Sequence, residues 1–129
     1  MYRSPVRQLS LIQLSSFANN WKRLKLTDED LRALELAIQA DPAGSPVMKG
    51  TGGLRKIRFS PASSASGKSG GARVCYAYFA EFNLVYLCAV FPKNSKANLT
   101  AAESAAYKSV LHRFSEYLRG NFKSKGTTP

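Results

Sequence analysis

Acidic residues are scarce in this sequence, and their absence is concentrated in one region. The chain has 129 residues with 19 Lys and Arg but only 8 Asp and Glu, for a net charge of +11. Residues 42–80 contain no Asp or Glu at all. A segment without carboxylates offers few ligands to a hard divalent cation, so we expect no metal site and no cofactor. The excess positive charge favours an anionic partner, either a nucleic acid or an anionic surface.

Histidine, cysteine and long apolar runs are also scarce. With His112 as the only histidine, a nuclease mechanism that pairs two histidines within one chain is excluded. The two cysteines, Cys75 and Cys88, lack zinc-ligand spacing and lie in apolar strand-like runs, which predicts buried reduced thiols in a cytoplasmic protein. No apolar run approaches the roughly 18 residues that a membrane-spanning helix needs, so we expect no membrane partner.

The spacing of the apolar residues predicts one α+β domain over residues 9–120. A strand is expected over 9–14, followed by two helices, the second of which begins with a Thr27-Asp30 capping box. Three strands over 54–59, 72–80 and 84–91 precede a last helix that ends at Gly120. The order is β-α-α-β-β-β-α, with helices packed on an antiparallel sheet. Residues 1–8 and 121–129 are expected to be flexible tails.

The most informative segment is a cationic strand, Leu54-Arg55-Lys56-Ile57-Arg58-Phe59. Its residues alternate with the period of a strand, so Lys56 and Arg58 share one face while Arg55 lies on the other. Arg73 on the next strand reaches the same face if the register permits, and Lys93 follows the strand after that. Cations held side by side on a rigid strand repel one another unless an anion is normally bound between them. A polyphosphate chain fits that requirement.

From the residues alone, two interpretations of this basic face stay open. The first is a non-catalytic surface that binds RNA or ribosome phosphates by electrostatics. The second is a metal-free ribonuclease, in which the 2′-OH attacks the adjacent phosphate and the cations stabilise the charge of the transition state. In that mechanism arginine binds the phosphate oxygens, and a lysine crowded by other cations serves as general base.

Two glycine-framed basic motifs, residues 50–59 and 67–74, together with Lys93-Asn94, resemble the HigB branch of the RelE toxin superfamily. The similarity covers roughly residues 9–118. It implies a RelE-like fold and a type II toxin–antitoxin toxin, an mRNA interferase that cleaves mRNA in the ribosomal A site and inhibits translation. It also implies a HigA-like helix-turn-helix antitoxin as partner, with a toxin that is monomeric when alone.

Carried over residue by residue, the resemblance assigns the site. The catalytic residues it implies are Lys56, Arg58, Arg73 and Lys93, and the expected RNA contacts are Lys49, Arg55, Lys68, Asn94 and Lys96. The tyrosine acid/base of RelE has no match; Tyr76 and Tyr78 are candidates by chemistry, although a structural role on the core side of their strand is favoured. A gyrase inhibitor of the ParE branch shares this fold but lacks the ribonucleolytic cations, and it stays as an alternative.

Overall fold

The computed structural model describes residues 9–61, 71–94 and 98–126 of the chain. The predicted tail over residues 1–8 lies outside them. The predicted order β-α-α-β-β-β-α is confirmed, and the elements are β1 (Ser10–Gln13), α1 (Ser15–Arg23), α2 (Asp28–Ala40), β2 (Leu54–Phe59), β3 (Ala72–Phe79), a 3-10 turn (Ala80–Phe82), β4 (Leu84–Pro92) and α3 (Ala101–Gly126).

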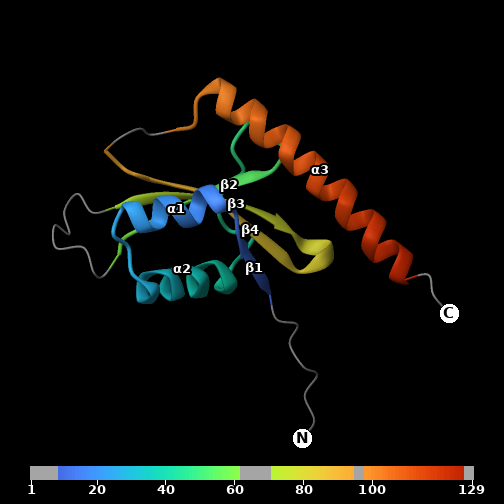
Figure 1. Cartoon of the computed structure of the whole chain (residues 1–129), viewed down its shortest axis with the longest axis horizontal. Coiled ribbons are helices and arrows are strands. Elements are labelled where there is room, and N and C mark those ends of the chain that lie inside the picture. The colour runs from blue at the N-terminus through green and yellow to red at the C-terminus, as the bar shows by residue number, and fades with distance from the viewer. Residues whose placement is uncertain (1–8, 62–70, 95–97, 127–129) are drawn as a thin grey trace, which may run out of the picture.

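The four strands form one sheet in the order β1-β4-β3-β2. β2, β3 and β4 pair antiparallel as expected, whereas β1 joins β4 in parallel, so the sheet is mixed. A hairpin would impose antiparallel pairing, but both helices and two strands separate β1 from β4 along the chain. Helices α1 and α2 lie on one side of the sheet and α3 on the other (Figure 1).

The face of the sheet toward α1 and α2 carries a continuous apolar core. Phe17, Trp21, Leu34 and Ile38 from the two helices are buried against Val74 and other residues of the sheet. The Phe17 and Trp21 rings stack with centroids 5.4 Å apart. The capping box of α2 forms as predicted: Thr27 Oγ1 accepts from Asp30 N–H, and Asp30 Oδ2 accepts from Thr27 N–H, both at 3.0 Å. We call this side of the sheet the paired-helix face.

The opposite side, the α3 face, has a smaller core. Leu54, Cys75, Ala77 and Cys88 of the sheet are buried there with Leu111 of α3. Helix α3 also runs further than the sequence predicts, because it continues through Gly120 to Gly126. The predicted stop at Gly120 is therefore wrong, and residues 121–126 are helical. An interior glycine costs about 1 kcal/mol, and packing of the buried Leu118 near this glycine offsets that cost.

The turn before β2 explains the first glycine-rich motif. Gly50, Gly52 and Gly53 all have positive φ, which other residues adopt only with strain. A Cβ atom on Gly52 would come within 3.2 Å of the Lys108 Cα atom, so this glycine also allows α3 to approach. Thr51 is fully buried; its hydroxyl donates to Met48 O at 2.7 Å and accepts from Leu54 N–H at 2.9 Å. The motif thus fixes where the cationic strand begins.

Candidate functional site

Lys56, Arg58 and Arg73 lie together on the α3 face. Arg58 is directly opposite Arg73 in the β2–β3 register, and Lys56 is opposite Cys75, whose side chain packs in the α3-face core. Strand alternation places all three cationic side chains on that one face. Residues directly opposite in an antiparallel pair have Cβ atoms roughly 4.5–5.5 Å apart. We call these three residues the basic cluster.

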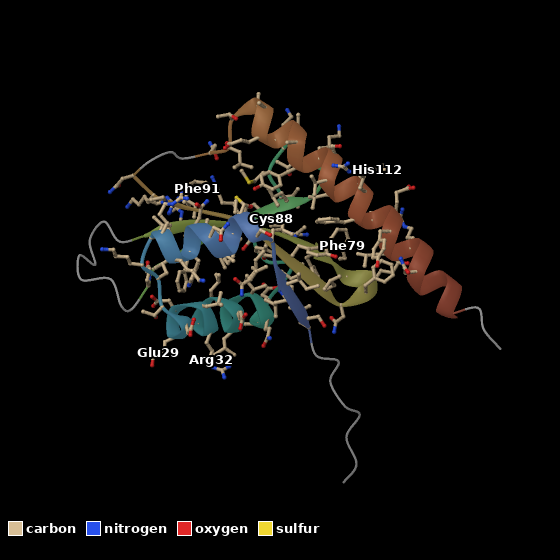
Figure 2. The ribbon with its side chains drawn as sticks, in the orientation of Figure 1. Glu29, Arg32, Phe79, Cys88, Phe91 and His112 are labelled. Atoms are coloured by element: carbon tan, nitrogen blue, oxygen red, sulfur yellow. The ribbon has the colours of Figure 1, made fainter. Side chains whose placement is uncertain are left out.

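The basic cluster occupies the part of the α3 face that α3 leaves open. Arg58 is exposed, and Lys56 and Arg73 are half-buried. Phe91, opposite Arg73 on β4, lies near the end of the sheet where nitrogen atoms gather in Figure 2, far from Phe79 at the other end. Within the described part of the chain, neither arginine of the cluster has a salt-bridge partner. The site is therefore positively charged and open to an anion.

Asn98 is a contact of the cluster that the sequence did not indicate. Its Oδ1 atom accepts a hydrogen bond from Lys56 Nζ at 2.6 Å. Asn98 lies in the connection between β4 and α3, 42 positions along the chain from Lys56. A lone asparagine before a helix gives no sequence signal of such a contact. The bond holds the end of a long flexible side chain in one place.

Two further predicted residues lie at the same end of the sheet. The Lys93 backbone N–H donates to Gly71 O at 3.0 Å, and its Cδ atom would lie 3.6 Å from a Cβ on Gly71. Gly71 immediately precedes the first residue of β3, Ala72, which is next to Arg73. Asn94 follows in the same turn and is exposed. Both residues therefore border the basic cluster.

Other predicted RNA contacts lie elsewhere. Arg55 is on the paired-helix face by strand alternation, and its guanidinium donates to Ala43 O at 2.9 Å and to Ser45 O at 2.6 Å, which ties down the loop after α2. Lys49 is exposed in the turn before β2, at the opposite end of that strand from Arg58. Lys68 and Lys96 are outside the described residues.

The tyrosines considered as proton donors are on the wrong side of the sheet for that role. Tyr76 is fully buried in the paired-helix core and its hydroxyl donates to Pro42 O at 2.8 Å. Tyr78 packs against the same core. On the α3 face, the Tyr107 hydroxyl donates to Cys88 O at 3.2 Å, and burial raises the pKa of Tyr107 to about 12. The structural role favoured for Tyr76 and Tyr78 agrees with these positions.

A pocket of about 260 Å³ opens beside the basic cluster, between α1, the end of β4 and the start of α3. Phe91 and Leu99 line it, and both connect to the cluster: Phe91 is opposite Arg73, and Leu99 follows Asn98. Its polar lining includes Ser16, Asn20, Glu103 and Tyr107. No pattern in the sequence connects Glu103 or Asn20 with the cations.

Three further features concern metal binding, membrane crossing and the cysteines. Among the residues that the structure describes, no three or more His, Cys, Asp and Glu side chains are grouped so as to hold a metal ion. Over the same residues, no helix has the length and apolar character required to cross a membrane. Cys75 and Cys88 are buried free thiols, as predicted.

Comparison with known proteins establishes the fold. No protein-family profile matches the sequence. The chain is similar in structure to a free-state mutant of the E. coli toxin RelE, with a TM-score of 0.51 and 17% identity over 78% of this chain and 96% of that one. The isolated E. coli RelE toxin gives a TM-score of 0.48 at 20% identity, over 79% and 98% of the two chains. The E. coli RelBE toxin–antitoxin complex gives 0.47 at 20% identity, over 65% and 95%. The α+β fold of this chain is thus RelE-like.

Proposed function

We propose that this chain is a ribonuclease toxin of a type II toxin–antitoxin system, an mRNA interferase of the HigB branch. The observation that carries the proposal is the basic cluster, in which Arg58 and Arg73 face each other on an open part of the sheet. The RelE-like fold and the two glycine-framed motifs support it. In this proposal the toxin acts on mRNA in the ribosomal A site in the cytoplasm, and a HigA-like antitoxin neutralises it.

The proposed chemistry uses the cluster and no metal. The 2′-oxygen attacks the adjacent phosphorus and the bond to the 5′-oxygen breaks. Water protonates the departing 5′-oxygen, so the products are a 2′,3′-cyclic phosphate and a 5′-hydroxyl. Arg58 and Arg73 bind the non-bridging oxygens, whose negative charge grows in the transition state. Lys56, held by Asn98, takes the proton from the 2′-OH. Lys93 binds a neighbouring phosphate from the adjoining turn.

The role of the cluster can be tested by removing two of its positive charges and, as a control, two positive charges elsewhere. We expect Lys56→Ala/Arg73→Ala to lower mRNA cleavage in a translating extract by about 10²-fold or more, the scale seen when a transition-state donor is removed. The control, Lys22→Ala/Arg23→Ala, removes two exposed cations from the end of α1 on the other side of the sheet. The control variant should cleave mRNA within a few-fold of the wild-type level. Equal cleavage by wild type and the first variant would refute the site.

Two further variants separate catalysis from plain electrostatics. Lys56→Arg keeps the charge but replaces an ammonium that can release a proton with a guanidinium that does not, so cleavage should fall with little loss of RNA affinity. Asn98→Ala keeps every charge and should lower cleavage several-fold by releasing Lys56. If only salt-dependent binding changes, the chain is a binding module. Inhibition of supercoiling without RNA cleavage would instead favour the gyrase alternative.

A further inference from the structure

A cavity of about 470 Å³ opens where α3 meets the turn before β2. The turn lies against the helix there, since a Cβ atom on Gly52 would come within 3.2 Å of the Lys108 Cα atom (Figure 1). Gly52 and the buried Leu111 line the cavity. The other lining residues share one face of α3 at the spacing i, i+3, i+4 and i+7, and they are Ala105, Lys108, Ser109 and His112.

The polar side chains of this cavity offer donors to an anion. Lys108 and Ser109 are exposed, and neither side chain has a hydrogen-bond or salt-bridge partner among the described residues. His112 is exposed as well, and its Nε2 atom lies 3.8 Å from Glu116 Oε2. Among the described residues that line the cavity, none is Asp or Glu. Lysine and serine side chains commonly bind the phosphate oxygens of nucleic acids, so the lining suits a phosphate.

The cavity lies in line with the basic cluster along β2. Arg58 and Lys56 are two positions apart on the α3 face, which is roughly 7 Å along a strand. Gly52 precedes Lys56 by four positions, and four residues span at most roughly 14 Å. Leu54, between Gly52 and Lys56, is buried in the α3-face core with Leu111. The cluster and the cavity are therefore close enough for one RNA strand to contact both, with a few nucleotides between the two contacts.

We propose that this cavity binds a second phosphate of the RNA strand whose scissile phosphate lies at the basic cluster. The inference rests on the proposed ribonuclease function. The Lys108 ammonium pairs with the phosphate charge and the Ser109 hydroxyl donates to a phosphate oxygen. The cavity is within the size range of small-molecule sites, roughly 300–1,000 Å³, so it has room for the attached ribose. Such a contact fixes the register of the strand at the cluster and does not select its sequence.

Binding of RNA of increasing length provides the first test. Fully 2′-O-methylated oligonucleotides lack the attacking hydroxyl and stay intact. Wild type should gain affinity in a step once the strand is long enough to reach both sites. Lys108→Gln should remove that step and lower the slope of log affinity against log salt by about 0.7, the value for one phosphate contact with a single strand. Arg119→Gln removes an exposed cation roughly three turns further along α3 and should preserve the step.

A substitution of opposite sign sharpens the test. Glu116→Gln removes the carboxylate beside His112, so the longer oligonucleotides should bind several-fold more tightly at low salt. Glu29→Gln makes the same charge change on α2, on the other side of the sheet, and should have little effect. Weaker binding in Lys108→Gln together with tighter binding in Glu116→Gln cannot arise from a general loss of folding.

The outcomes separate this inference from the proposed function. Equal affinity and equal salt slope in Lys108→Gln and Arg119→Gln overturn the phosphate site, and so does a loss of affinity that is the same for every oligonucleotide length. Binding of a polyglutamate peptide that depends on Lys108, with RNA binding unchanged, would assign the cavity to an acidic protein and also overturn it. A wild type that shows the Lys108-dependent step but never cleaves unmodified RNA would defeat the proposed function alone.

Discussion

The two faces of the sheet differ in how completely they are covered. On the paired-helix face, buried residues from β2, β3 and β4 meet the side chains of α1 and α2 in one continuous core. On the α3 face, the apolar core occupies one part of the sheet, and the basic cluster occupies the part beside it. The chain thus holds its fold together mainly on one side and presents charge on the other.

This difference separates the residues needed for stability from those proposed for function. Buried apolar side chains stabilise a domain in proportion to the area they remove from water. The basic cluster buries little and brings like charges together, so it contributes nothing comparable and opposes folding slightly. Substitutions in the paired-helix core should therefore change mainly the free energy of unfolding, and substitutions in the basic cluster should change mainly RNA cleavage.

The largest expected effect is on the paired-helix face. Phe17 is fully buried there and stacks on Trp21, so Phe17→Ala should lower the free energy of unfolding by about 3–5 kcal/mol. Leu36→Ala on α2 is the control; that side chain is 58% exposed, and its loss should matter by no more than about 0.5 kcal/mol. Urea unfolding measures both. Similar small losses in the two variants would contradict the picture of a dominant core on this face.

The covered part of the α3 face can be probed with pH. Burial, with a smaller contribution from Cys75, raises the pKa of the Cys88 thiol from 9.0 to about 12, and burial likewise raises the pKa of Tyr107 from 10.0 to about 12. The unfolded chain releases both protons at lower pH than the folded chain does. Stability is therefore full below about pH 9 and falls as pH rises toward 12, by up to about 1.4 kcal/mol per pH unit for Cys88. The contribution of Tyr107 is smaller, because water screens its half-buried phenol.

Urea unfolding at several pH values between 8 and 11 tests this expectation. Cys88→Ala should be less stable at pH 8 but should lose less stability than wild type as the pH rises, because one of the two titrating groups is gone. An identical pH slope in both proteins would mean that the core under α3 admits water. The α3-face core would then be less protected from water than the burial of its residues indicates.

The sequence predicted the fold well because each element has a local signal. The period-two pattern of β2 and the Thr27 capping box each depend on neighbouring residues, and both were found in the structure. The helix stop at Gly120 was wrong because packing along α3 overrides the local preference of a single glycine. Local sequence patterns also did not predict the parallel pairing of β1, because this pairing depends on residues far apart in the chain.

The sequence predicted the site only where strand alternation tells which side chains share a face of the sheet. Alternation put Lys56 and Arg58 on one face from the sequence alone, but the position of Arg73 depended on the register, which no local pattern reveals. Asn98 and the pocket around Asn20 arise from contacts between distant elements, α1, β4 and the start of α3. Arg55 lies apart from the cluster and its guanidinium donates to loop carbonyls, so an RNA contact by this residue stays a prediction.

The smallest expected effect tests the basic cluster without any RNA. Arg58→Gln removes one of two like charges that face each other across β2 and β3, so the free energy of unfolding should rise by roughly 0.2–1 kcal/mol at low salt. The gain should shrink as salt screens the repulsion, and inorganic phosphate should stabilise wild type more than the variant. Arg23→Gln makes the same charge change on α1 and should do neither. If Arg58→Gln is neutral or destabilising at every salt concentration, the two arginines do not repel, and the physical reason for placing an RNA phosphate between them is lost.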